Sequence, residues 1–207
     1  MSLAALRVWR VPFSTNVERI ALAAAYKGVA IDWVDVDPED RGVLEQISGQ
    51  RLVPVLEVNG EVVTDSPVIL RWLEALYPEP PLWPRSERGR AEADLFVDWF
   101  NRAWKRPPNE LAEELAKAEP DPARVEQLGG AIAGYLGLFE GLLEGRDYLL
   151  GDFSVADVIA FPFLKYAVDR TPGDTELFHH VLREWIPVEG KPRLVDWIAR
   201  IDALPRA

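Results

Sequence analysis

Short apolar runs and amphipathic segments alternate along roughly the first third of the chain. Four runs are rich in β-branched and aromatic residues and predict strands, at residues 6–11, 31–37, 53–58 and 61–64. Three other segments favour helices, at residues 16–27, 39–47 and 66–77. The resulting order, βαβ followed by αββα, predicts one small α/β unit.

Turn and capping residues support these boundaries. Asn59-Gly60 separates two β-rich runs and is a strong signal for a tight hairpin. Gly28 is placed to close the first helix, because glycine readily adopts the left-handed conformation at a helix end. At the start of the third helix we expect Ser66 to be the N-cap and Pro67 the first helical residue, where its missing N–H costs nothing.

Beyond the third helix the pattern changes, first to the proline-rich stretch PEPPLWP and then to helices alone. A long helix is expected over residues 87–105, and Pro107-Pro108 is expected to break it. Further helical segments begin near Asn109, after Pro122, after Phe153 and at residue 193. We therefore expect three parts, an α/β domain at 1–77, a linker at 78–86 and an all-α domain at 87–207.

Charge and cysteine content narrow the classes of function. The formal net charge of −11 argues against DNA or RNA as the main partner. The chain has no cysteine, which excludes disulfides, a cysteine nucleophile and thiolate metal sites, and is compatible with a reducing cytoplasm. No apolar segment is long enough for a membrane span, and no convincing signal peptide is present, so we expect a cytoplasmic protein.

Other polar residues give no sign of a metal site or of a second chemistry. The two histidines, His179 and His180, are adjacent and form a poor chelating pair. Acidic pairs such as Glu113-Glu114 are interpreted as solvated helix faces. The sequence contains no glycine loop with the spacing of a phosphate or dinucleotide site, so we expect neither a metal nor a nucleotide cofactor.

Pro54 lies inside the apolar run LVPVL, although a central strand needs every backbone N–H. Two interpretations fit this residue. It is either a cis-proline whose loop exposes the backbone N–H and C=O of Val53 to a ligand, or a proline at a bulge or edge strand with no ligand. The residues that follow it, which begin the third helix, favour the first interpretation.

The segments VPVL, Asn-Gly and DSPVILRWLEALYP together resemble the N-terminal domain of glutathione transferases. This resemblance implies a thioredoxin-like domain in which Val53 and cis-Pro54 bind glutathione, and Asp65 and Ser66 hold its γ-glutamyl end. The physics is consistent, because a helix N-terminus offers free N–H groups and a positive dipole end to a carboxylate. Asp65 can take the ammonium of the same group, and a capping role of Ser66 is compatible with binding.

The segment FSTNVERIALAAAYKGV carries a second match, in which Ser14 stands where theta-, tau- and zeta-like transferases have the serine that activates the thiol. The resemblance therefore assigns thiol activation to Ser14. Thr15-x-x-Glu18 has the form of a capping box, so we assign Thr15 to the helix cap and Ser14 to chemistry. Arg19 is interpreted as structural or as a support for the site. Lowering the thiol pKa from ~8.5 to ~6.5 requires about 2.7 kcal/mol.

Leu52 departs from the family pattern, because many members have Lys or Gln immediately before the Val of VP to bind the glycine carboxylate. Arg51 and Gln50 are near enough in sequence to replace that contact. Their side chains start from different faces of the backbone. The expected thiol is therefore glutathione or a related low-molecular-weight thiol.

The C-terminal half adds a third match, since GDFSVADVIAFPFL resembles the helix-capping segment of the family. Ser154-x-x-Asp157 predicts a capping box that serves folding and not catalysis. The second-substrate site is expected to be apolar and to lie between the domains, with Trp99, Trp104 and Tyr166 as candidate lining residues. Each of these aromatics is, taken singly, more typical of a core or a dimer interface.

The resemblance covers nearly the whole chain and implies a cytosolic, homodimeric, serine-type glutathione transferase with glutathione as co-substrate. The thiolate would attack a mainly apolar electrophile. Two alternatives remain open: a non-catalytic protein that binds thiols or hydrophobic ligands on the same fold, and a different thiol-dependent reaction such as dehalogenation, isomerisation or peroxide reduction. Cysteine-based thiol exchange is excluded, because the chain has no cysteine.

Overall fold

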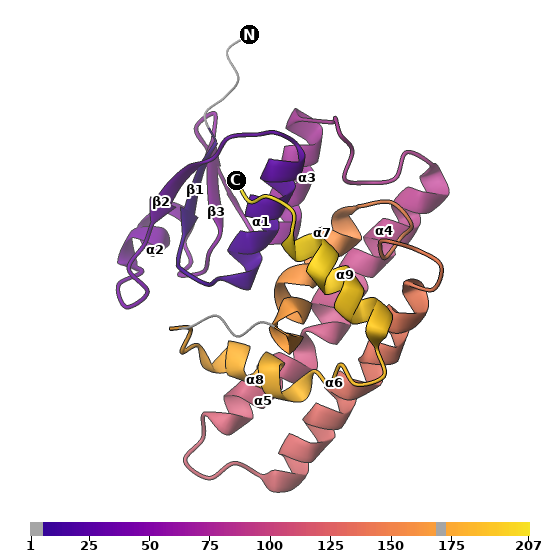
Figure 1. Ribbon diagram of the computed structural model, residues 1–207. Coiled ribbons are helices and arrows are strands. Elements are labelled where there is room, and N and C mark those ends of the chain that lie inside the picture. Colours follow the sequence, from indigo (N-terminus) through magenta and orange to yellow (C-terminus); the bar gives the residue numbers. More distant parts are fainter. Residues whose placement is uncertain (1–5, 169–172) are drawn as a thin grey trace. The chain divides into compact units, whose positions relative to one another are not determined.

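The computed structural model describes residues 6–168 and 173–207, which fall into two compact units (Figure 1). The first unit contains the chain up to Trp83 together with Leu204–Ala207, and the second contains Pro84–Ala203. The first is the expected α/β part and the second is entirely helical, which confirms the fold class. The return of the last residues to the first unit is a feature that the sequence pattern does not predict.

The first unit is built on a four-stranded sheet with the strand order β2-β1-β3-β4. Its strands are β1 (Arg7–Arg10), β2 (Asp32–Asp35), β3 (Val55–Val58) and β4 (Glu61–Thr64). β1 and β2 are parallel, whereas β1–β3 and β3–β4 are antiparallel. Asn59 and Gly60 both have positive φ and form the predicted hairpin turn between β3 and β4. All four predicted strands are confirmed.

Three helices pack on this sheet, α1 (Thr15–Tyr26), α2 (Gly42–Ser48) and α3 (Ser66–Leu76). Successive strand residues point to opposite faces, and this alternation separates two apolar clusters. On one face Val11 and Val55 pack with Leu44 of α2. On the other face Val8 and Leu56, which are partners across β1 and β3, are fully buried, and α1 and α3 contact each other. The predicted helices are confirmed, with ends shifted by at most three residues.

The second unit contains six α-helices among the described residues, joined in part by single turns of other helix types. Their bounds are α4 (Glu87–Trp99), α5 (Arg106–Leu115), α6 (Pro122–Leu142), α7 (Val155–Leu164), α8 (Leu177–Trp185) and α9 (Pro192–Asp202). The sequence pattern does not predict α8. Within residues 6–168 and 173–207, none of the helices has the length and apolar character needed to cross a membrane.

The expected break at Pro107-Pro108 is wrong. α5 begins at Arg106 and contains both prolines in its first turn, where a missing N–H removes no helical hydrogen bond. The irregularity lies earlier, in a π-helical turn over Phe100–Trp104 that is closed by a bond of 3.0 Å from Lys105 N–H to the Phe100 carbonyl. Helical structure therefore continues from α4 into α5 through this wider turn.

The start of α7 contains the predicted capping box. The Ser154 hydroxyl accepts from Ala156 N–H, and Asp157 Oδ2 accepts from Ser154 N–H at 2.9 Å. Asp157 Oδ1 also accepts from Leu149 N–H at 3.0 Å and from Trp197 Nε1 at 2.8 Å, so this fully buried carboxylate links three segments. Burial outweighs these hydrogen bonds and raises the pKa of Asp157 to about 6.

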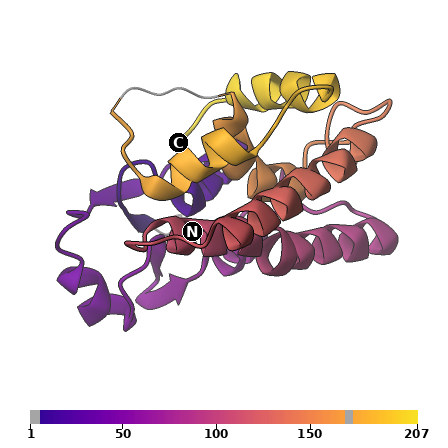
Figure 2. The ribbon, with the colours of Figure 1, turned by 90° about the horizontal axis from the view of Figure 1, so that it is seen from below.

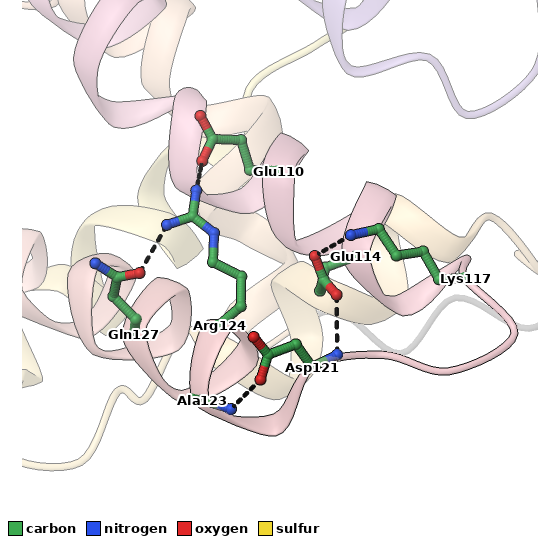
Figure 3. Close-up of polar contacts among 7 residues, drawn as sticks. All are labelled: Glu110, Glu114, Lys117, Asp121, Ala123, Arg124 and Gln127. Carbon is green, nitrogen blue, oxygen red and sulfur yellow. Dashed lines mark hydrogen bonds and ion pairs between the residues drawn. The ribbon is translucent and has the colours of Figure 1, made fainter.

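α5 and α6 lie side by side in both views (Figures 1 and 2). Carboxylates of α5 close the turn between them. Figure 3 shows Arg124 of α6 bound to Glu110 of α5, and Glu114 accepting from Lys117 Nζ and from the backbone N–H of Asp121. Glu114 is 7% exposed, so the interpretation of its acidic pair as a solvated face is wrong for this residue. These carboxylates are used in folding the hairpin.

Candidate active site

Ser14 lies at the start of α1, where it is the N-cap. Its hydroxyl accepts from Val17 N–H at a long 3.4 Å, and its carbonyl accepts from Glu18 N–H at 3.0 Å. The expected Thr15–Glu18 capping box is therefore wrong: Thr15 is already helical and buried. Phe13 precedes the cap with φ of 61°, which turns the chain into the helix one residue earlier than the capping pattern suggests.

The weak cap leaves the Ser14 hydroxyl with bonding capacity. A hydroxyl has one donor hydrogen and two lone pairs, and the bond from Val17 uses one lone pair only. The hydroxyl can therefore donate its hydrogen to an anionic sulfur at the positive end of the α1 dipole. Both effects favour a thiolate over a thiol.

The peptide bond between Val53 and Pro54 is cis, as predicted, whereas the binding role of Val53 stays a prediction. Pro54 directly precedes β3 and is buried. Val53 packs against the cluster of Val11 and Val55, which brings it near the end of β1. The paired register of β3 begins at Val55, so Val53 lies outside the ladder formed with β1.

The start of α3 is formed by a strained residue. Asp65 occupies the cap position with φ of 69° and is exposed, and Ser66 is the first helical residue. The prediction that Ser66 caps the helix is therefore wrong. A positive φ is uncommon for a residue other than glycine and is often found where function fixes the backbone. Here it leaves the Asp65 carboxylate in solvent beside the N-terminus of α3.

Ser66 instead links α3 to α1 through a buried polar network. Its hydroxyl accepts from an Arg19 terminal nitrogen at 3.1 Å and lies 3.3 Å from Asn16 Oδ1, which also accepts from Arg19 at 3.1 Å. Arg19 is fully buried; desolvation lowers its pKa to about 9, and the Asp65 carboxylate opposes this shift. Asn16 was not identified from the sequence, although its spacing of three residues from Arg19 places both on one side of α1.

Arg51 and Leu52 have surroundings of a different kind. Arg51 is exposed, and its guanidinium lies 3.5 Å from Glu45 Oε2 on α2. Leu52 is 64% exposed, with no polar atom in its side chain to bind a carboxylate. The one cation expected at the glycine end of the ligand is therefore already paired with an acidic side chain.

A cavity of about 460 Å³ opens beside Ser14, and its lining residues all belong to the first unit. Its walls come from the end of β1, the loop before α1, one side of α1, the end of β2 and the C-terminal segment. The lining residues are Arg10, Val11, Pro12, Phe13, Ser14, Val17, Glu18, Ala21, Asp35 and Arg206. This volume is within the range of small-molecule sites.

The C-terminal segment is fixed to α1 and β2 at this cavity. Arg206 Nε and a terminal nitrogen lie 3.3 and 3.2 Å from Glu18 Oε1. Ala207 N–H donates to the Ala21 carbonyl at 3.1 Å, and its own oxygen accepts from Trp33 Nε1 at 3.0 Å. No local sequence signal predicts these contacts, because the partners are far apart in the chain.

The three aromatic candidates for the second-substrate site lie in the helical unit. Trp104 is 1% exposed and stacks on Phe100 at 4.5 Å, and Tyr166 is 2% exposed and stacks on His179 at 4.2 Å. Both therefore form part of the core of that unit. Trp99 is half-buried, with its ring edge-on to Tyr135 at 5.6 Å.

His179 has a structural environment. Its Nδ1 lies 2.9 Å from Asp174 Oδ2, which also accepts from Arg183 at 2.6 Å. Burial lowers the pKa of His179, and the Asp174 carboxylate opposes that shift. Across the part of the chain that the structure describes, no group of three or more potential ligand side chains is placed to hold a metal ion.

Family comparisons cover most of the chain in two blocks. Residues 9–81 match the glutathione S-transferase N-terminal domain, and residues 122–200 match the glutathione S-transferase C-terminal domain. The first match contains Ser14, Pro54 and Ser66, and the second contains the capping box of α7.

Similar curated proteins have several names. FtsZ-localized protein A of Caulobacter vibrioides is 36% identical over 48% of this chain and 47% of its own length. Glutathione S-transferase theta-1 of Rattus norvegicus is 27% identical over 76% of this chain and 64% of its own length. Glutathione S-transferase 3 of Zea mays is 28% identical over 98% of this chain and 97% of its own length. This chain thus spans less than two thirds of the first two relatives.

Solved structures share the architecture over nearly the whole chain. Poplar glutathione transferase F1 superimposes with a TM-score of 0.77 at 20% identity, covering 96% of this chain and 92% of its own. A maleylacetoacetate isomerase from Anaeromyxobacter dehalogenans, with bound dicarboxyethyl glutathione and citrate, has a TM-score of 0.73 at 25% identity, covering 99% and 89%.

Proposed function

The chain belongs to the glutathione S-transferase family, and we propose that it is a glutathione-dependent transferase in which Ser14 activates the thiol. The observation that carries this proposal is the start of α1. There a weakly engaged serine hydroxyl, a helix N-terminus and a cavity of about 460 Å³ occur together. This combination can stabilise a thiolate and hold the molecule that it attacks.

The chemical step requires little of the protein beyond stabilising charge. Glutathione loses its thiol proton to solvent, and the Ser14 hydroxyl donates a hydrogen bond to the resulting thiolate. The sulfur then forms a bond to the electrophilic carbon of the second substrate, and the electron pair leaves with a departing group or moves into a conjugated system. A reduction of the thiol pKa from ~8.5 to ~6.5 raises the thiolate fraction at pH 7 from a few per cent to about three quarters.

We assign glutathione binding to the start of α3 and to the segment around cis-Pro54. We propose that Asp65 binds the γ-glutamyl ammonium and that Ser66, with the N-terminus of α3, binds its carboxylate. Buried Arg19 holds the Ser66 hydroxyl in position and adds a positive charge behind it. The backbone of Val53, before cis-Pro54, pairs with the cysteinyl unit in the way that an added strand pairs with a sheet edge.

The glycine end has the weakest site. Arg51 would have to exchange its contact with Glu45 for the glycine carboxylate, and Leu52 has no group to offer. We therefore propose weak binding at this end and a low requirement for the glycine unit. A cytoplasmic homodimer and a mainly apolar electrophile complete the proposal; light scattering in solution tests the dimer.

The test of the proposal is the turnover of a chlorodinitrobenzene with glutathione by Ser14→Ala. We expect glutathione to bind and turnover at pH 7 to fall about 25-fold, because the thiolate fraction falls from about three quarters to a few per cent. Ser86→Ala is the matched control, because Ser86 caps α4 through an equivalent bond of 3.1 Å to Gly89 N–H in the helical unit. Equal turnover of the Ser14 and Ser86 variants would remove Ser14 from the reaction.

Isomerisation is a second candidate, and a specific similarity favours it. The maleylpyruvate isomerase of Ralstonia sp. is 33% identical over 40% of this chain. On the same site, addition of the thiolate to a carbon–carbon double bond, rotation and expulsion of the thiolate would return glutathione unchanged. Consumption of thiol separates the two reactions, because a transferase consumes glutathione with each turnover and an isomerase does not.

A further inference from the structure

The cavity beside Ser14 also contains an arginine that the chemistry above does not use. Arg10 is the last residue of β1 and lines the cavity. Its side chain is held from two sides, because Nε donates to Asp35 Oδ1 at 2.7 Å and the guanidinium lies 4.9 Å from the centre of the Trp33 ring. A guanidinium fixed in this way loses little further freedom when it binds a ligand.

Arg10 has donors left for such a ligand. The bond to Asp35 uses Nε, whereas a guanidinium has five N–H groups in a fork that matches a carboxylate. The Asp35 side chain is 73% exposed and the Arg10 side chain 38%. Asp35 also lines the cavity, and its bond to Nε leaves the terminal nitrogens of Arg10 for a ligand.

The second charged pair of the cavity is the ion pair between Arg206 and Glu18, whose two charges largely cancel. Arg206 directs two nitrogens at Glu18 Oε1, and both side chains are largely buried, at 25% and 18% exposed. This pair fixes the wall formed by the C-terminal segment. Most of the other lining residues are apolar, including Val11, Pro12 and Val17.

We propose that this cavity binds a small, mainly apolar molecule with a carboxylate, and that Arg10 binds that carboxylate. The proposal rests on the function proposed above and deepens it, since it identifies the second substrate as an anionic electrophile. The cavity volume of about 460 Å³ suits a substituted aromatic ring or a short unsaturated acid. Ser14 then faces the same space as the carboxylate anchor.

The sheet itself supplies a matched control for Arg10. Arg7 and Asp32 are paired across the same two parallel strands, three positions earlier in the same register, with Nε 3.0 Å from Oδ2. Arg7 is not one of the described residues that line the cavity. Arg7→Met and Arg10→Met therefore remove the same charge and the same kind of strand-to-strand ion pair, but only Arg10→Met changes the cavity.

A direct binding experiment tests the site without turnover. Calorimetric titration of the full chain compares a dinitrobenzoate with the dinitrobenzene that lacks only the carboxylate. We expect the wild type and Arg7→Met to bind the dinitrobenzoate about tenfold more tightly than the dinitrobenzene. Arg10→Met should bind the two compounds equally. Failure of the acid to bind, or an unchanged preference in Arg10→Met, would overturn the proposal.

A kinetic experiment separates this proposal from the one on which it rests. With glutathione, the sulfur displaces chloride from a chlorodinitrobenzoate or the matching chlorodinitrobenzene, so one carbon–sulfur bond forms and one carbon–chlorine bond breaks. In Arg10→Met we expect KM for the benzoate to rise about tenfold, with KM for glutathione unchanged. Turnover of both compounds without an Arg10-dependent preference rejects the anion site and retains the transferase. Binding of the acid without turnover of either compound rejects the transferase and retains the anion site.

Discussion

Serine is the N-cap of both α1 and α7, and the two helix starts are used differently. At α7 the Ser154 hydroxyl and the Asp157 carboxylate form a reciprocal capping box, and Asp157 is fully buried. At α1 the Ser14 hydroxyl has one long bond of 3.4 Å, the cap has no reciprocal partner of the Asp157 kind among the described residues, and a cavity opens beside it. The same residue type at the same helix position thus serves folding in one unit and is available to a ligand in the other.

The difference lies in how completely the surroundings satisfy each polar group. Asp157 accepts from two backbone N–H groups and from Trp197 Nε1, so a ligand would have to replace bonds that already exist. Ser14 keeps its donor hydrogen for a sulfur, because its one bond from Val17 N–H uses a lone pair. A fully satisfied buried network stabilises one structure, whereas an incompletely satisfied polar group in a cavity is a candidate for function.

Replacing Asp157 should cause the largest loss of stability. Asp157→Ala leaves Leu149 N–H, Ser154 N–H and Trp197 Nε1 without their acceptor inside the helical unit. We expect a loss of about 4 kcal/mol in the free energy of unfolding, measured by urea denaturation. A loss below about 1 kcal/mol would contradict the structural role of this carboxylate.

The titration of Asp157 gives the next largest effect. Its folded pKa of about 6 exceeds its ordinary value of 3.8, so the folded state holds the proton more tightly than the unfolded state. The stability from this group is therefore fully present below pH 3.8 and is lost as the pH rises to about 6. The change is about 3 kcal/mol, at about 1.36 kcal/mol per unit.

This titration is measured as a difference between proteins. Urea denaturation of the wild type and Asp157→Asn over this pH range should give a stability difference that varies with pH, because Asn does not titrate. A constant difference would show that the folded and unfolded pKa values of Asp157 are equal.

The two serine caps themselves should differ by a smaller amount. Ser154→Ala removes part of a buried network and should cost about 2 kcal/mol, whereas Ser14→Ala removes one long bond and should cost about 0.5 kcal/mol. Thermal and urea unfolding of the two variants measure these values. Equal costs would mean that Ser14 is an ordinary structural cap.

A third helix start, that of α3, extends the comparison to ligand binding. Asp65→Asn removes the exposed carboxylate expected to bind the γ-glutamyl ammonium, and we expect glutathione affinity to fall about tenfold. Glu61→Gln changes the net charge equally at an exposed position on β4 and is the control. If calorimetry gives the same glutathione affinity for both variants, Asp65 does not bind the γ-glutamyl ammonium.

Local sequence signals predicted the elements well and the details of the site less well. The cis bond at Pro54 was predictable, because a proline in an apolar run before a hairpin cannot donate to a strand ladder and is suited to a sharp loop. The choice between Ser14 and Thr15 as cap was not, because both residues have the same capping chemistry and the turn at Phe13 decides between them. The break expected at Pro107 is wrong because the first turn of a helix accepts proline.

Contacts between distant parts of the chain were beyond the reach of the sequence. The bond from Trp33 to Ala207 joins residues 174 positions apart, and the Glu18–Arg206 pair joins residues 188 apart. No periodicity or turn signal encodes such pairs, although Glu18 and Arg206 both line the cavity beside Ser14. The packing of Trp104 against Phe139 of α6 and Phe163 of α7 likewise depends on which helix faces meet.

The role of Ser14 can be measured directly as the pKa of the thiol of bound glutathione. This pKa is obtained from the ultraviolet absorbance of the thiolate as a function of pH, with saturating glutathione, in the wild type, Ser14→Ala and Ser86→Ala. We expect a pKa of ~6.5 in the wild type and Ser86→Ala, and a return toward ~8.5 in Ser14→Ala. The same thiol pKa in all three proteins would contradict the role of Ser14.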